Sequence, residues 1–132
     1  MRLLYKSIAP ENRMNGNGSV QGGWIFEKMD YAALTIGSED FIWKLKGVAA
    51  VTNSANIKYH SSVFPHEYIE IWGKYSHISS ARFDTYVECR QRKRKTDEWE
   101  VVATATFSFC LIDAITRNII RIPREIINEI KG

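Results

Sequence analysis

An aspartate that follows a pair of glycines by seven residues is the part of this sequence best suited to chemistry. Gly22 and Gly23 open a run with helical spacing, and Asp30 lies inside that run. The first amides of a helix have no partner within it and lie at the positive end of the helix dipole, so they can hold negative charge on a carbonyl oxygen. Glycine has no Cβ, which lets such an oxygen come close to the backbone. The pair could instead serve only to turn the chain into the helix.

Asp30 is predicted to lie on an apolar side of this helix. One apolar stripe repeats at helical spacing and consists of Ile25, Met29, Ala32 and Ile36. A neighbouring stripe contains Phe26, Ala33 and Gly37, and Asp30 falls within it. A carboxylate among apolar residues is costly unless it is paired or used. It could activate water, attack a carbonyl itself, or be satisfied by a neighbouring strand or by a partner's Lys or Arg.

The elements that would position these residues are one helix and several long strands. The helix is predicted from Trp24, with a break at Gly37 and Ser38 and a second short helix or tail over residues 39–45. Ser38 is expected on the polar face. Residues 11–23 hold four of the eight glycines and indicate a loop. Strands are predicted over residues 2–9, 47–60, 67–78, 80–92 and 98–112, and a terminal helical turn or frayed tail over residues 124–132.

The last two strands alternate between apolar and polar residues. The predicted inner face consists of Phe83, Thr85, Val87 and Cys89 in the first strand, and of Val101, Ala103, Ala105, Phe107, Phe109 and Leu111 in the second. Long strands joined by short turns form an antiparallel sheet. The predicted fold class is therefore α+β, with about five antiparallel strands wrapped around one long central helix, in a single domain over residues 1–132.

Composition narrows the class of protein further. Apolar residues make up 45% of the 132-residue chain, enough for a hydrophobic core without disulfides or metals. The net charge of +3 is too modest to indicate a nucleic-acid partner. No stretch approaches the roughly 20 apolar residues of a membrane span, and the N-terminus lacks a signal-peptide pattern, so we expect a cytoplasmic protein. Cys89 and Cys110 are expected to be free thiols, because strand pairing would hold them apart.

The segment NGNGSVQGGWIFEKMD, from Asn15 to Asp30, closely resembles the opening of the hot-dog acyl-CoA thioesterases. The likeness is to the bacterial short-chain acyl-CoA hydrolases and the cytosolic acyl-CoA hydrolases of animals. The matching residues are Asn17, Gly18, Gly22, Gly23, Trp24, Met29 and Asp30. Residues 101–113 and 121–123 resemble later parts of the family more loosely. The chain departs from the pattern at Ser19, where relatives often carry Asp or Asn, and over residues 59–63, which read YHSSV.

The resemblance implies a hot-dog fold and the hydrolysis of an acyl-CoA to a fatty acid and CoA. It implies no metal and no cofactor beyond the CoA of the substrate. Asp30 is the expected general base or nucleophile, and the amides of Gly22 and Gly23 are the expected oxyanion hole. Asn17 and Ser19 are expected beside them in the catalytic site.

The resemblance also suggests which residues bind the substrate and how subunits assemble. Asn15 and Gln21 are expected to orient the carbonyl or a water, and Ser54 is a weaker candidate on the strand expected to line the cleft. In hot-dog enzymes one subunit supplies the helix start and the other the acid, so a homodimer that assembles into a hexamer is expected.

The basic run over residues 90–95 has two interpretations. Its arginines, Arg90, Arg92 and Arg94, could bind the phosphates of CoA, or the run could be a solvated hairpin tip whose charge prevents edge pairing. The histidines lack the spacing of a metal site. A thioesterase for acyl-carrier protein or aryl-CoA would fit the same fold. A non-catalytic acyl-CoA-binding or regulatory protein is the alternative outside the enzymes, and Ser19 is the residue that leaves it open.

Overall fold

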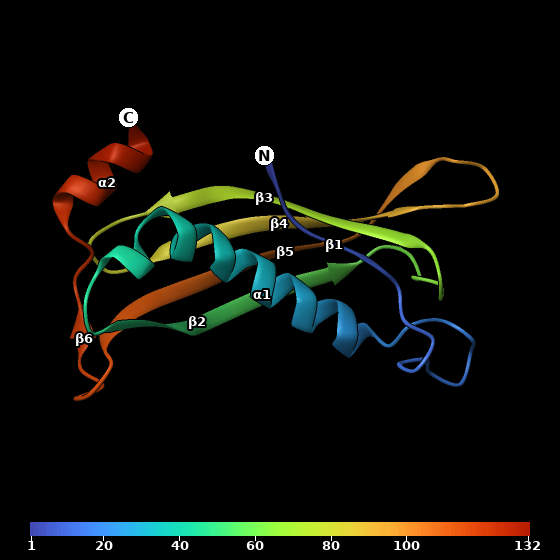
Figure 1. The fold of residues 1–132 in the computed structure, drawn as a ribbon, viewed down its shortest axis with the longest axis horizontal. Helices are drawn as coiled ribbons and strands as arrows, with labels where there is room; N and C mark the ends of the chain where they lie inside the picture. The colour runs from blue at the N-terminus through green and yellow to red at the C-terminus, as the bar shows by residue number, and fades with distance from the viewer.

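One antiparallel sheet with a long helix, α1, across one face makes up the protein (Figure 1). The computed structural model describes residues 1–132. The five long strands are β1 Arg2–Ile8, β2 Val48–Tyr59, β3 Tyr68–Ile78, β4 Phe83–Arg92 and β5 Trp99–Asp113, and their order in the sheet is β1-β3-β4-β5-β2. A two-residue strand, β6 Ile119–Ile120, pairs with β5. The five predicted strands are therefore confirmed, whereas β6 was not predicted.

The helix α1 extends from Gly22 to Asp40 and contacts all five long strands. Its predicted apolar stripe, Ile25, Met29, Ala32 and Ile36, is buried as expected. Because β1 precedes α1 and β2 follows it, the helix connects the two opposite edges of the sheet. A short 3-10 helix, η1 Ile42–Lys44, and a terminal helix, α2 Arg124–Lys131, complete the elements.

The predicted break at Gly37 and Ser38 is wrong, since α1 continues through both residues to Asp40. Gly37 is present because the helix lies very close to β4 at this point. A Cβ on Gly37 would be only 2.6 Å from Cζ of Phe83. Ser38, expected on the polar face, is 7% exposed.

The inner face of the sheet follows the predicted alternation in β4 and departs from it in β5. A β-bulge between Cys89 and Arg90 inserts one extra residue into β5. Val102 and Ala103 are both fully buried as a result, and Val101, predicted to face inward, is exposed. Cys89 lies opposite Ala103, and both cysteines are free thiols. Burial raises the pKa of the Cys89 thiol to about 12, so this thiol stays protonated.

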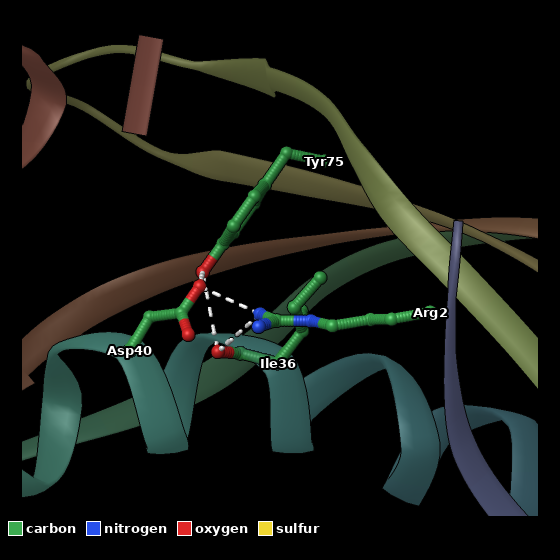
Figure 2. Close-up of polar contacts among 4 residues, drawn as sticks. All are labelled: Arg2, Ile36, Asp40 and Tyr75. Carbon is green, nitrogen blue, oxygen red and sulfur yellow. Dashed lines mark hydrogen bonds and ion pairs between the residues drawn. The ribbon is translucent and has the colours of Figure 1, made fainter. Parts of the chain in front are cut away.

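A polar network fixes the C-terminal end of α1 to β1 and β3 (Figure 2). Arg2 Nη2 lies 2.6 Å from Asp40 Oδ2, and the hydroxyl of Tyr75 donates to the same oxygen at 2.7 Å. Arg2 Nη2 also donates to the carbonyl of Ile36 at 3.5 Å, and that carbonyl lies 3.2 Å from the Tyr75 hydroxyl, whose single proton it shares with Asp40. Burial, and then the hydrogen bond to Asp40, raise the pKa of Tyr75 above its ordinary value and keep its hydroxyl a donor. The Arg2 cation is favourably placed at the negative end of the helix dipole.

No helix of the structure is both long and apolar enough to cross a membrane.

Replacing Gly37 with alanine tests the close packing of α1 on β4. Gly37→Ala should lower the free energy of unfolding by about 1–3 kcal/mol, because the added methyl group overpacks a buried aromatic contact. That loss should exceed the gain of about 0.5–1 kcal/mol in helix propensity. Denaturant unfolding measures the difference. Gly16→Ala, where a Cβ would meet nothing within 4 Å, is the control and should change stability by less than about 0.5 kcal/mol.

Candidate active site

Asp30 lies at the middle of α1, half-buried, and faces the edge strand β2. Its Oδ1 accepts a hydrogen bond from the hydroxyl of Thr52 at 3.2 Å. No lysine, arginine or histidine forms an ion pair with it, and Oδ2 has no partner within the chain. The carboxylate is therefore held by one neutral hydroxyl and keeps acceptor capacity for another group.

The start of α1 presents amides that no protein group uses. The helix ladder cannot pair the amides of Gly22 and Gly23, and no turn, cap or side-chain hydrogen bond takes them. Tyr59, at the end of β2, donates from its hydroxyl to the carbonyl of Gly22 at 2.8 Å, and its ring lies against that residue. Gly23 is exposed. The helix therefore begins with open donors at its positive end, next to an aromatic ring.

The polar residues of the preceding loop bond mainly to one another. Asn17 Oδ1 accepts from the hydroxyl of Ser19 at 2.6 Å and from its amide at 3.0 Å. Asn15 Oδ1 accepts from the amide of Asn17 at 3.1 Å. Gly18, between the bonded residues, has a φ of 85°, which favours glycine. In this chain Asn15, Asn17 and Ser19 shape the loop that leads to α1, and Ser19 is itself buried.

Gln21 occupies the N-cap position of α1 without capping it through its side chain. Its side-chain nitrogen donates to the carbonyl of Met14 at 3.4 Å, and its oxygen accepts from Arg13 at 3.5 Å. The side chain thus bonds back to the loop.

Ser54 does not join Asp30 within one chain. A β-bulge between Thr52 and Ser54 reverses the alternation of β2 at this point. Thr52 therefore pairs with the core residue Phe109, whereas Ser54 pairs with Ser108 on the face of the sheet away from α1. There Ser54 lines a polar groove of about 650 Å³ with Asp84 and other residues.

The arginines of the basic run differ in their surroundings. Arg90 donates to Glu88 at 2.9 Å and lies over the ring of Trp72, and Arg92 forms an ion pair with Asp97. The guanidinium of Arg94 forms no ion pair in the chain, so it is the arginine of the run with full capacity for an anion. The hairpin that carries the run lies at the same end of the molecule as the start of α1 (Figure 1).

A single chain does not enclose a site around these groups. Seven residues of helix separate Gly23 from Asp30, which is roughly 10 Å along the axis. None of the five main grooves of the chain includes Asp30. A groove of about 560 Å³ lies instead at the other end of α1, between Ile36, Tyr75 and Ile130. The structure has no group of three or more His, Cys, Asp or Glu side chains placed to hold a metal ion.

Two site neighbours, Thr52 and Tyr59, were not predicted from the sequence. Thr52 contacts Asp30 across 22 positions of sequence, and Tyr59 contacts Gly22 across 37. Both lie on the predicted strand over residues 47–60. The bulge between Thr52 and Ser54 decides which side chains of this strand point toward α1. No local spacing in the sequence reveals either contact.

The comparisons with known proteins agree on the fold. Residues 17–98 match the family model described as the thioesterase superfamily. A hexameric hotdog-fold thioesterase of Campylobacter jejuni is similar with a TM-score of 0.84 and 18% identity, over 98% of this chain and 96% of that chain. A hexameric broad-specificity acyl-coenzyme A thioesterase has a TM-score of 0.82 and 21% identity, over 98% and 88% of the two chains. DHNA-CoA thioesterase from Staphylococcus aureus has a TM-score of 0.79 and 17% identity, over 96% and 89%. No curated protein sequence matches this chain. The predicted hot-dog fold is confirmed.

Replacing Asn17 with alanine tests whether the loop before α1 is stabilised by its own side chains. Asn17→Ala should lower the free energy of unfolding by about 0.5–1.5 kcal/mol, because the buried Ser19 loses its closer acceptor and keeps only Asn15 Oδ1 at 3.3 Å. Chemical denaturation measures this change. Asn118→Ala removes an exposed amide whose side chain bonds to nothing in the chain, and it should leave stability unchanged. Equal effects of the two variants would show that the loop network contributes nothing.

Proposed function

Since the chain belongs to the thioesterase superfamily, we propose that it hydrolyses acyl-CoA thioesters to a carboxylic acid and CoA. The observation that carries the proposal is Asp30, a half-buried carboxylate held by the hydroxyl of Thr52 and neutralised by no cation. Such a group remains available as a base or a nucleophile. The neighbours described as acyl-CoA and DHNA-CoA thioesterases support a CoA thioester as the substrate class.

The open amides of Gly22 and Gly23 are proposed to bind the carbonyl oxygen of the thioester. Attack on the carbonyl moves negative charge onto that oxygen, and two preorganised amides at the positive end of a helix stabilise the charge. Asp30 either takes a proton from the attacking water or attacks the carbon itself. In both routes the C–S bond then breaks and CoA leaves as a thiolate that takes up a proton. The second route leaves a mixed anhydride with Asp30, which water cleaves to the acid and the free carboxylate. Single-turnover hydrolysis in ¹⁸O-labelled water tests the second route, because label in the Asp30 carboxylate arises only from an anhydride that water cleaves at the aspartyl carbon. Label in the product acid alone arises from direct attack by water or from cleavage of the anhydride at the acyl carbon.

We propose that a second subunit completes the site. The separation of Gly23 from Asp30 along one helix is too great for both to act on one carbonyl, so the helix start of one chain would serve the acid of its partner. The strand β2 supports this assembly, since it is an edge strand of 12 residues with exposed residues from Thr52 to Asn56. A long edge with one charged residue is suited to pairing with another copy. The similar structures described as hexameric support a hexamer.

Arg94 is proposed to contact the phosphates of CoA from the β4–β5 hairpin. Its guanidinium has no carboxylate partner, whereas the guanidinium groups of Arg90 and Arg92 pair with Glu88 and Asp97. Asn15, Asn17, Ser19 and Gln21 are proposed to act indirectly, by shaping the loop that presents the two glycine amides.

Hydrolysis of a C2 to C18 panel of acyl-CoAs, followed through CoA release with a thiol reagent, tests the proposed activity. Asp30→Asn should reduce kcat by at least about 100-fold on every substrate that the wild type cleaves, the scale of a lost general base. Its fold should persist, because asparagine can still accept the hydrogen bond from Thr52.

Glu39→Gln is the matched control for this experiment. Glu39 is an exposed carboxylate on the same helix with no ion pair, so its loss should leave kcat unchanged. A wild type that binds CoA but releases none from any acyl-CoA would refute the hydrolase and favour a binding protein. An active Asp30→Asn variant would refute the role of the carboxylate.

Charges placed along β2 test the proposed assembly. Wild type should have a mass six times that of the 15.2 kDa chain by light scattering. The double variant Ser54→Lys with Asn56→Lys places lysines at the edge, which should separate subunits and abolish activity together. Thr106→Lys adds a charge one strand further in, opposite Asn56, and should leave the dimer intact. A monomeric wild type with full activity would contradict the shared site.

A further inference from the structure

Gln91 is a buried amide on β4 whose polar atoms are all used. Its side chain is 0% exposed. Its Oε1 accepts a hydrogen bond from the amide of Phe64 at 3.0 Å, and its Nε2 donates to the carbonyl of Ser62 at 3.1 Å. Gln91 also lies opposite Glu100 on β5.

The loop that Gln91 holds, residues 60–67, supports the start of α1. Val63 lies between the two bonded residues, is 0% exposed, and accepts the amide of Val20 through its carbonyl at 2.8 Å. Val20 is 3% exposed and precedes Gly22 by two residues. No other side chain bonds to the backbone of residues 60–66. A continuous set of hydrogen bonds therefore leads from Gln91 through Val63 to Val20, two residues before the first open amide.

We propose that Gln91 is a positioning residue that fixes the amides of Gly22 and Gly23 for the thioesterase reaction, acting through Val63 and Val20. The proposal rests on the proposed function. Amides that stabilise an oxyanion must be held to within a fraction of an ångström, and loops without regular structure provide this only when their backbone is bonded to a rigid element. Backbone bonds from His60 and Ser61 to Val102, and from His66 to Ala9, hold the two ends of the loop. Gln91 supplies the side-chain hydrogen bonds at its middle, on both sides of Val63.

Gln91→Met tests the role, because methionine has similar length and volume but makes no comparable hydrogen bonds. With an acyl-CoA that the wild type cleaves, kcat should fall about tenfold or more while KM stays within about twofold, since Gln91 does not contact the substrate. Amide hydrogen exchange should become faster over residues 60–67 and over residues 18–24. All variants are compared at a temperature where circular dichroism shows them folded.

Two variants of the same strand provide matched controls. Thr85→Val replaces a buried hydroxyl that has no hydrogen-bond partner and should leave kcat and exchange unchanged. Val87→Ala creates a cavity four residues from Gln91 and should lower stability. Its kcat should nevertheless stay within about twofold of the wild type, because the loop keeps its bonds.

The outcomes separate this inference from the proposed function. Wild-type kcat in Gln91→Met, or an equal loss of kcat in Val87→Ala, would overturn the positioning role. A wild type without activity would refute the proposed function, and the exchange data would still decide the inference. Unchanged protection of residues 18–24 in Gln91→Met would overturn it, whereas selective loss of protection there would support it.

Discussion

The arrangement of the site depends on α1 lying across a sheet whose edge strand it leaves uncovered. The helix buries its apolar stripe against β3, β4 and β5, where the core is dense with phenylalanines. Over β2 the contact is thin, and residues Thr52 to Asn56 stay exposed. Asp30 points into this thin region, so its carboxylate is sheltered by the helix yet escapes the full desolvation of the core. A carboxylate at Met29, which is 0% exposed, could not remain charged without a buried partner.

The start of α1 differs from the rest of the backbone, because nearly all backbone polar groups in a folded protein are paired. The surrounding loops meet this demand closely, since Gln21 bonds to Arg13, Val20 to Val63, and Ala9 to Glu67 through backbone atoms. The amides of Gly22 and Gly23 stand out as donors among so many satisfied groups. Because the loop is fixed on both sides, these open donors have a defined direction. Such a fixed direction is what the proposed binding of an oxyanion by these amides requires.

The fold and the placement of Asp30 and the glycine pair on α1 could be predicted from the sequence, because both depend on local signals. Helical spacing placed Asp30 beside the apolar stripe, and strand alternation placed Phe83 and Val87 in the core. The features that could not be predicted from the sequence are contacts between strands. The bulges at Cys89/Arg90 and Thr52/Ser54 depend on how two strands pair, and each changes which side chains face inward. The role of Gly37 also depends on a contact between elements. A glycine within a helical pattern predicts a break, whereas here it allows α1 to lie close to Phe83 of β4.

Two aspartates on one helix show how the neighbouring strands decide whether the charge of a carboxylate is balanced within the chain. Asp40 lies at the C-terminal end of α1, where the helix dipole disfavours a negative charge. Arg2 and Tyr75 both bond to one of its oxygens and stabilise that charge. Its charge is thus balanced within the chain. Asp30 receives only the hydroxyl of Thr52, a neutral donor that orients the carboxylate and leaves its charge uncompensated. Residue type and element are the same, so the difference lies in the neighbouring strands. The carboxylate whose charge is left uncompensated is the one that faces the exposed edge strand β2, which is the position that the proposed reaction requires.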